Sequence, residues 1–441
     1  MMIERFFKFK EAGTDLKTEI SAGITTFMAM AYIIFVQPAI LSHGGMDFGA
    51  VMVATCLASA IATFIMGIYA NYPIALAPGM GENFYFVFTV ILGMGIAWQK
   101  VLGAVFISGI VFLILSIWRV REKLINAIPE SLQCGIAGGI GLFISFIGLL
   151  QSGIIQKGGA ALTIGNFHRK EVILSIIGLF IIGLFIAKRI KGGILIGMII
   201  TAIIGIFMGV VKYQGIVGKI PSLSPTFLKL DIIGALKEGL FTVIFVFLFM
   251  DIFDTVGTVI GIGQSAGFIK DGKLPRANRV LFSDAVGTTV GALLGTSTVT
   301  SYIESAAGVS AGGKTGFASV VTAFLFLLSL FFYPFVKMVG TGIQIKEGVT
   351  LYPVTAPALI IVGSLIISTI KRIKWDDPTE SIPAFLALVG IPLTYNIGEG
   401  MAFGFISYFI LKLFTGRYKE LNWPISIIAI AFILRFIFLT K

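Results

Sequence analysis

The chain has little charge and few of the residues that build catalytic or metal centres. Of its 441 residues only 12% are charged, and only two are cysteine and two histidine. Cys56 and Cys134 both lie in apolar segments and offer no disulfide framework. His43 and His168 lie in loops without a second ligand at metal spacing, which argues against a zinc site. We therefore expect no metal, no other cofactor and no enzymatic centre.

A nucleotide-binding loop is also missing. The nearest segment, GGKTG at Gly312 to Gly316, lacks the glycine spacing of GxxxxGK[ST] and follows an apolar segment rather than a strand. This argues against ATP-driven transport within the chain. The first 18 residues, MMIERFFKFKEAGTDLKT, are mixed and charged, so we expect no cleavable signal peptide and interpret residues 1–18 as a cytoplasmic lead-in.

Apolar residues and glycine dominate what is present. Hydrophobic residues make up 57% of the chain, 53 residues are glycine, and the mean hydropathy is +0.99. A soluble domain of this length does not have such a composition, so the sequence predicts an all-α polytopic membrane protein with closely packed helices. The net charge of +11 arises from bases in the connections and indicates membrane orientation rather than a nucleic-acid partner.

Fourteen apolar segments and one tail segment can be drawn along the chain. They are 20–41, 51–70, 73–93, 100–118, 130–151, 171–188, 193–211, 238–262, 278–294, 297–312, 315–336, 349–370, 380–394 and 397–414, with the tail at 423–439. A straight span needs about 20 residues. Segments 297–312 and 380–394 are shorter, so we expect them to be broken, re-entrant or half-length. Whether 423–439 spans the membrane is left open by Arg435 within it.

Basic residues support a cytoplasmic N-terminus. With that orientation five basic connections fall inside, namely those with Arg119, Arg121 and Lys123, with Lys188, Arg189 and Lys191, with Lys270, Lys273 and Arg276, with Lys371, Arg372 and Lys374, and with Lys412, Arg417 and Lys419. The connection 212–237 carries four lysines, falls outside and is the exception. It divides the chain into halves of seven spans, and an odd number per half inverts one half relative to the other.

Two corresponding spans look broken. The third begins YPIALAPGMGENFYF, from Tyr72 to Phe86, and the tenth contains TSTVTSYIES within the small-residue run from Gly295 to Gly312. Each pattern predicts a short extended piece that runs into a helix start, with Glu82 and Asn83 at one start and Glu304 and Ser305 at the other. Carboxylates are costly at bilayer depth, so these acids indicate a functional cavity between two half-helix N-termini.

The eighth span carries a polar stripe. In FLFMDIFDTVGTVIGIGQSAG, Phe247 to Gly267, helical spacing places Asp251, Asp254, Thr255 and Thr258 on one side. Two neighbouring buried acids do not both stay charged without a proton or a cation, so this stripe favours an ion-coupled site. The alternative is that one aspartate, Asp254 rather than Asp251, is structural.

Five segments together carry a family resemblance. They are GITTFMAMAYIIFVQPAIL in the first span, ALAPGMGENFYF in the third, MDIFDTVGTVIG in the eighth, TSTVTSYIESAAGVSAGGKTG in the tenth, and IPAFLALVGIPLTYNIGEGMAFGFISY near the end. In these the chain resembles, over nearly its whole length, the AzgA-like hypoxanthine, guanine and adenine permeases of the nucleobase-ascorbate transporter superfamily. Two positions depart from the family pattern. Glu82 stands where an apolar residue is usual, and Gln37 where asparagine is common.

The resemblance implies a uracil-permease-like fold of fourteen spans in two inverted seven-span repeats. Its core domain would comprise 19–118 and 238–336, its gate domain 119–237 and 337–414, and 415–441 would form a hydrophobic tail. It further implies proton-coupled import of a purine base across the plasma membrane, here a bacterial cytoplasmic membrane, by movement of the core against the gate. A homodimer through the gate is a further implication, and no nucleic acid is expected.

The resemblance assigns Asp251, Glu304 and Asn83 to the substrate and Asp284 to a position behind the tenth-span site, with no catalytic residue and no metal. With their neighbours, the predicted substrate-binding residues are Asp251, Glu304, Asn83, Thr26, Phe27, Thr255 and Ser305, and the predicted proton-coupling residues are Asp251, Glu304 and Asp254. Glu82, which departs from the family pattern, either adds a protonatable group that supports the site or faces a water-filled vestibule. A carboxylate that accepts from adjacent N–H groups of a purine gives directional, charge-assisted binding. Glu399, in the expected gate, is interpreted as a structural hydrogen-bonding residue.

Other functions remain to be weighed. A channel would show repeated pore segments and an enzyme a nucleophile or metal set, and neither pattern is found. The nearest rival is a transporter of the same fold for uracil, xanthine or an inorganic anion. A basic residue in the tenth-span site would favour an anion as substrate, and the acidic Glu304 argues against one. The sequence does not rank the purines or decide between protons and sodium.

Overall fold

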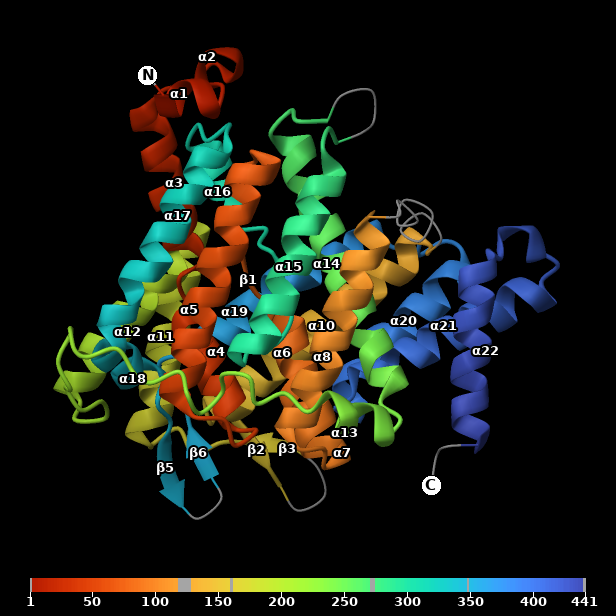
Figure 1. Ribbon diagram of the computed structural model, residues 1–441. Helices are drawn as coiled ribbons and strands as arrows, with labels where there is room; N and C mark the ends of the chain where they lie inside the picture. The colour runs from red at the N-terminus through yellow and green to blue at the C-terminus, as the bar shows by residue number, and fades with distance from the viewer. Residues whose placement is uncertain (1, 118–127, 159–161, 270–273, 347–348, 439–441) are drawn as a thin grey trace.

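The computed structural model describes residues 2–117, 128–158, 162–269, 274–346 and 349–438 (Figure 1). The basic residues Arg119, Arg121, Lys123, Lys270 and Lys273, which entered the predicted topology, lie outside these ranges. The first half comprises α1 (Met2–Phe6), α2 (Phe9–Ala12), α3 (Leu16–Met30), α4 (Ile33–Ser42), α5 (Phe48–Ile65), η1 (Met66–Ala70), β1 (Leu76–Pro78), α6 (Met80–Phe84), η2 (Tyr85–Ile91), α7 (Leu92–Met94), α8 (Trp98–Ile117), α10 (Glu130–Gln151), β2 (Ile155–Lys157), β3 (Leu162–Ile164), α11 (Lys170–Ala187) and α12 (Gly193–Phe207).

The second half repeats this mixture of long helices and short pieces. It comprises α13 (Ile232–Lys237), α14 (Phe241–Ser265), α15 (Ala277–Leu294), β4 (Val299–Ser301), α16 (Ser305–Ser310), α17 (Gly316–Ser329), η3 (Leu330–Phe332), α18 (Tyr333–Gly340), β5 (Ile343–Lys346), β6 (Val349–Leu351), α19 (Ala356–Ile366), η4 (Ile367–Arg372), α20 (Pro378–Thr394), α21 (Ile397–Phe414), η5 (Tyr418–Glu420) and α22 (Trp423–Phe438).

The helices confirm the predicted class. Within the described residues, eight helices are long and apolar enough to cross a membrane. The third and tenth segments are broken as predicted, because each holds a short strand followed by a short helix: β1 and α6 in one, β4 and α16 in the other. The protein is therefore an all-α polytopic membrane protein in which short strands interrupt the third and tenth spans. The total of fourteen spans stays a prediction.

Three parts of the chain differ from the predicted pattern. Segment 20–41 is interrupted at Ala31 and Tyr32, between α3 and α4. Segment 380–394 was expected to be broken, re-entrant or half-length, yet it lies in one unbroken helix of 17 residues, α20. A helix of that length extends about 26 Å, close to the ~30 Å hydrocarbon core, so no break is needed. Two hairpins, β2 with β3 and β5 with β6, were not predicted.

The helices pack in two groups. In the first, α8 packs against α14 and α15, while α17 packs against α3 and α5. In the second, α10 packs against α19, α20 and α21, and α11 against α12 and α19. Glycine permits the close approach in the second group, because a Cβ on Gly135 of α10 would lie 2.5 Å from the carbonyl oxygen of Ala384 in α20. Figure 1 shows the first two helices at the top, hereafter the N-terminal face, and both hairpins at the bottom, hereafter the hairpin face.

A charged cluster links the start of α20 to the chain that follows α21. Arg417 Nη1 lies 2.6 Å from Asp377 Oδ2, and this hydrogen bond, with a second from Thr379, lowers the pKa of Asp377 from 3.8 to about 2. Because the folded pKa is depressed, the stabilisation is complete above the unfolded pKa and is lost as pH falls through the folded value.

We expect Asp377→Asn to lower the melting temperature of the purified protein at pH 6 and to approach wild type as pH falls from about 4 towards 2. The measurement is a pH series of melting curves in detergent. Asp376→Asn is the matched control, because Asp376 makes no ion pair with the described residues. If the difference in melting temperature between Asp377→Asn and wild type stayed constant down to pH 3, below the ordinary pKa of aspartate, Asp377 would not be the stabilising carboxylate.

Candidate functional site

The two broken spans meet in the middle of the molecule. β1 and β4 pair antiparallel, with Leu76 opposite Ser301, Ala77 opposite Thr300 and Pro78 opposite Val299. Further hydrogen bonds extend the crossing at both ends, from Gly79 N to Thr298 O at 3.0 Å and from Tyr302 N to Ala75 O at 2.9 Å. Extended backbone can lie inside a membrane protein only when its polar groups are satisfied in this way.

Each strand delivers the N-terminus of a short helix to this crossing. β1 continues into α6 and β4 into α16, so Asn83 and Glu304 are carried to the same region from the two halves of the chain. The free N–H groups and positive dipole ends of such helix starts favour carboxylates and polar solutes. The predicted juxtaposition of two helix starts is present.

Glu304 stands at the N-cap position of α16 and is half-buried. Its Oε1 accepts a 2.8 Å hydrogen bond from the hydroxyl of Tyr32, which lies at the break between α3 and α4. The neighbouring Ile303 is 53% exposed, so this part of the crossing is accessible. A carboxylate with one fixed donor and an accessible edge can accept further hydrogen bonds from a ligand.

The polar stripe of α14 faces the crossing. Thr300 donates to Asp254 Oδ2 at 3.2 Å, and the backbone N–H of Ser301 donates to Thr255 Oγ1 at 3.1 Å. Asp251 Oδ2 instead accepts a 2.8 Å bond from Thr288 on α15. The stripe predicted from helical spacing is thus real, and β4 and α15 provide its partners.

The two aspartates of that stripe have different surroundings. Asp251 is only 1% exposed, whereas Asp254 is exposed although it lies in the middle of α14. Asp254 also lies within electrostatic range of Glu304 and of Glu82. The more accessible carboxylate is therefore Asp254, the residue for which the sequence favoured a structural role.

Asn83 is fully buried in α6. Its Oδ1 accepts from the hydroxyl of Ser297, which also accepts from Gln37 Nε2 at 3.4 Å, while Gln37 Nε2 donates to Thr296 at 2.8 Å. Among the described residues, Asn83 Nδ2 and Glu82 Oε2 have no hydrogen-bond partner. Two buried polar atoms near the crossing thus remain available to a ligand or a proton.

Three predicted ligand contacts lie around the crossing rather than at its centre. Ser305 Oγ accepts from Ala75 N at 3.0 Å and ties α16 to the other broken span. Thr26 packs against Gly308 of α16, where an added Cβ would lie 2.0 Å from its hydroxyl oxygen. Phe27 packs edge-to-face on Phe326, with ring centroids 5.4 Å apart. These contacts hold α16 and α17 in place.

The supporting acid of the ninth span is buried. Asp284 is fully buried in α15, one helical turn before Thr288. Thr288 bonds Asp251 and also both polar groups of the Val299 backbone, donating at 3.2 Å and accepting at 3.0 Å. The role of Asp284 behind the tenth span stays a prediction.

Two tyrosines were missed by sequence reasoning. Tyr32 donates to Glu304, and Tyr302 donates to the carbonyl of Pro78 at 2.6 Å. Their rings lie 6.5 Å apart beside the crossing. A buried tyrosine hydroxyl needs a hydrogen-bond partner. Tyrosines beside interrupted spans could therefore have been predicted as site residues from the sequence.

Comparison with known proteins decides the family. Residues 17–403 match the family described as Permease family (Xan_ur_permease). A putative permease of Methanocaldococcus jannaschii is 54% identical, with 99% of each chain covered. The guanine/hypoxanthine permease PbuG of Bacillus subtilis is 45% identical over 99% of this chain and 100% of that protein. The adenine permease AdeP of Escherichia coli is 43% identical over 99% and 96%.

The chain belongs to the Permease family. This membership confirms the predicted resemblance and identifies a multi-pass integral membrane protein of the plasma membrane that transports rather than catalyses. Solved structures agree on the fold. The permease superposes on the transmembrane domain of a cyanobacterial bicarbonate transporter, BicA, with a TM-score of 0.67 at 14% identity, covering 87% and 97% of the two chains. It superposes on the murine anion transporter Solute Carrier 26 member A9 with a TM-score of 0.64 at 11% identity, covering 91% and 69%.

Glu399 of this permease lies outside the crossing. Its Oε1 is 2.5 Å from Arg435 Nη2 of α22, and both side chains are largely buried. The arginine is a structural partner of the kind expected for Glu399, and its role stays a prediction. The same ion pair holds α22 against α21, which accounts for a charged residue within the apolar tail.

Proposed function

We propose that this permease imports purine nucleobases, hypoxanthine, guanine or adenine, by proton symport. The observation that supports the proposal is the β1 and β4 crossing: Thr300 of β4 bonds the accessible Asp254 of α14, and the helices that follow the two strands carry Glu304 and the buried Asn83. The relatives named as adenine and guanine/hypoxanthine permeases, at 43% and 45% identity, support the substrate class.

The base would lie between spans 1, 3, 8 and 10, next to the crossing. A purine edge carries N–H donors and ring acceptors in one plane. Carboxylates accept two adjacent N–H groups, and the free Nδ2 of Asn83 donates to a ring nitrogen or oxygen. We assign direct contact to Glu304, Asp254 and Asn83, and keep Thr255, Ser305, Thr26 and Phe27 as the residues that shape the site.

Proton coupling is assigned to the acids Asp251, Asp254 and Glu304. Carboxylates that approach each other away from bulk water favour a shared proton, because two adjacent negative charges repel. Binding of the base would change the partners of Glu304 and Asp254, and so their proton occupancy. Asp251, held by Thr288, would take part without touching the base, and Asp284 and Glu82 would support the site.

The two packing groups support the proposed domains. The group around α8, α15 and α17 corresponds to the core, 19–118 and 238–336, and the group around α10, α19 and α20 to the gate, 119–237 and 337–414. Movement of the core against the gate would expose the crossing to either side. A homodimer through the gate remains a prediction from the resemblance.

Labelled hypoxanthine, guanine, adenine, xanthine and uracil, offered to cells without their own base carriers, test this function. We expect concentrative uptake of at least one of the three proposed purines that a protonophore abolishes. Uptake of uracil or xanthine alone would favour the rival substrate class. Uptake driven by a sodium gradient and indifferent to the protonophore would replace the proton as coupling ion.

The two aspartates give a sharper prediction. Asp254→Asn should raise the KM for the base about tenfold or more, because a charged acceptor is lost at the ligand. Asp251→Asn should keep the KM within about threefold and lower the maximal rate, because its carboxylate bonds Thr288 instead of the base. Kinetics of both variants in the same cells separate the roles. A raised KM for Asp251→Asn with a normal KM for Asp254→Asn would mean that Asp251 contacts the base and Asp254 does not, as the sequence favoured.

A further inference from the structure

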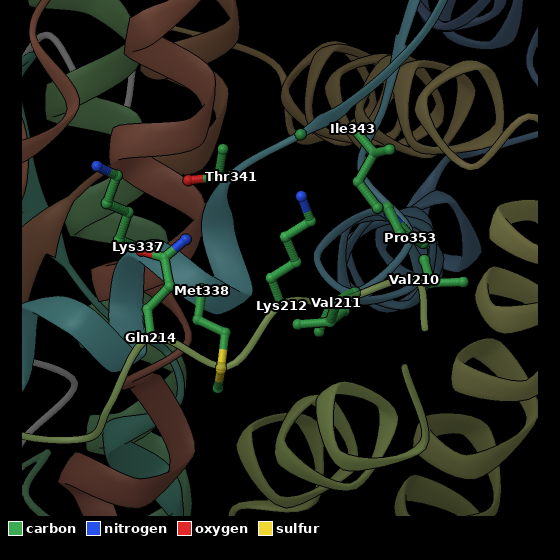
Figure 2. A pocket seen from close by; sticks show the side chains of 11 residues that line it. Val210, Val211, Lys212, Gln214, Lys337, Met338, Thr341, Ile343 and Pro353 are labelled. Carbon is green, nitrogen blue, oxygen red and sulfur yellow. The ribbon is translucent and has the colours of Figure 1, made fainter. Parts of the chain in front are cut away.

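A second candidate site lies on the hairpin face, away from the crossing. A cavity of about 220 Å³ opens there between the chain that follows α12, the end of α18 and the chain that precedes α19 (Figure 2). α18 packs on α4 and α5, whereas α12 packs on α11, and α11 on α19. The lining residues belong to the proposed gate, but the boundary at 336/337 falls inside α18, which packs on α4 and α5 of the proposed core and also on α12 of the gate. The cavity therefore lies beside the boundary between the proposed core and gate domains, where a solute would enter from this face.

The cavity has two unlike sides. Lys337, Thr341, Gln214 and Lys212 contribute polar groups, and in the view of Figure 2 the Thr341 hydroxyl and the Gln214 amide lie between the two lysine ammonium groups. Apolar side chains fill the other side, among them Val210, Val211, Ile343 and Pro353. A flat solute with an apolar face and a polar edge matches this division.

The polar side is built mainly of donors. Neither Lys212 nor Lys337 forms an ion pair with the described residues, and no carboxylate lines the cavity. The Nζ of Lys337 lies 6.0 Å from the centre of the Tyr333 ring. Lysine offers donors and no acceptor, so the cavity selects ligands whose edge carries acceptors or negative charge.

Purine bases differ at that edge. A 6-oxopurine presents two adjacent acceptors, O6 and N7, which lysine recognises well, whereas adenine replaces O6 with an amino donor. An ammonium group repels the amino group and attracts the oxo group. Lys212 belongs to the one connection that departs from the expected charge distribution.

We propose that this cavity is an entry site on the hairpin face that captures 6-oxopurines in preference to adenine. The inference rests on the proposed function and deepens it by ranking the substrates. The cavity holds the base beside this boundary before the crossing becomes accessible, so it acts on the apparent affinity for external base and not on the maximal rate.

Kinetics of the double variant Lys212→Gln/Lys337→Gln test the proposal. We expect the KM for hypoxanthine and guanine to rise about three- to tenfold, the size of one or two exposed charged hydrogen bonds. The KM for adenine and all maximal rates should stay unchanged. Lys346→Gln is the matched control, an exposed lysine of β5 outside the cavity, and Lys212→Arg/Lys337→Arg should keep the wild-type KM.

The KM measured separately from each side of the membrane supplies a second test, because a purely structural role of the two lysines would not make the effect depend on the side. In vesicles of opposite orientation, the double variant should show the raised KM only when hypoxanthine is offered to the hairpin face. An unchanged ratio of the hypoxanthine and adenine KM values would overturn the entry site while leaving purine transport intact. So would a change confined to inhibition by inorganic phosphate, which would identify an anion site. Absence of purine uptake by the wild type would refute the proposed function itself.

Discussion

Glu304→Gln is expected to reduce Vmax/KM for the transported base by about 10- to 100-fold, the loss that follows when a charged acceptor of one or two N–H groups becomes neutral. The amide keeps the size of the side chain and can still accept from Tyr32, which donates to Glu304 at 2.8 Å. It cannot carry a proton. Residual uptake by this variant should therefore be insensitive to a protonophore and should stop at equal concentrations inside and outside.

Two companion variants isolate this effect. Tyr32→Phe removes only the donor to Glu304, so we expect a smaller loss, about three- to tenfold, with proton coupling retained. Glu171→Gln, a half-buried acid in the first turn of α11, away from the crossing, should transport like wild type. Surface abundance is measured for each by labelling from outside the cell. Concentrative, protonophore-sensitive uptake by Glu304→Gln at the wild-type rate would remove this acid from both binding and coupling.

The interruptions of the third and tenth spans were predictable because their residues exclude a continuous helix. Pro73 and Pro78 flank the extended piece of one span, and the small and β-branched residues before Glu304 favour extension in the other. Helical spacing alone predicted that Asp251, Asp254 and Thr255 lie on one side of α14. The pairing of β1 with β4 was not accessible, because it joins residues more than 200 positions apart.

What the sequence did not provide was the partner of each polar group. Spacing placed both aspartates on one stripe, but only the positions of Thr288 and Thr300 distinguish the enclosed Asp251 from the accessible Asp254. The unbroken α20 was missed for a related reason. Its short length and its two internal prolines suggest a break when the segment is taken alone. Packing on α10 and α21 stabilises the continuous helix, and this packing is not visible in the sequence.

Lys412→Met is expected to destabilise the folded protein by about 3–5 kcal/mol, the usual result of removing one member of a buried ion pair. The Lys412 side chain is 0% exposed and lies in the last turn of α21. Its Nζ is 2.9 Å from Glu380 Oε1 and 2.7 Å from Glu420 Oε2. Without the ammonium group, Glu380 keeps a buried carboxylate that, among the described residues, retains a weak 3.4 Å hydrogen bond from Tyr408.

Unfolding of the purified variant by denaturant in detergent micelles measures this loss. The double variant Lys412→Met/Glu380→Gln should recover part of it, because the abandoned charge is removed together with its partner. Lys419→Met, an exposed lysine of η5, should stay within about 0.5 kcal/mol of wild type. A double variant less stable than Lys412→Met alone would mean that Glu380 is stabilised by something other than this lysine.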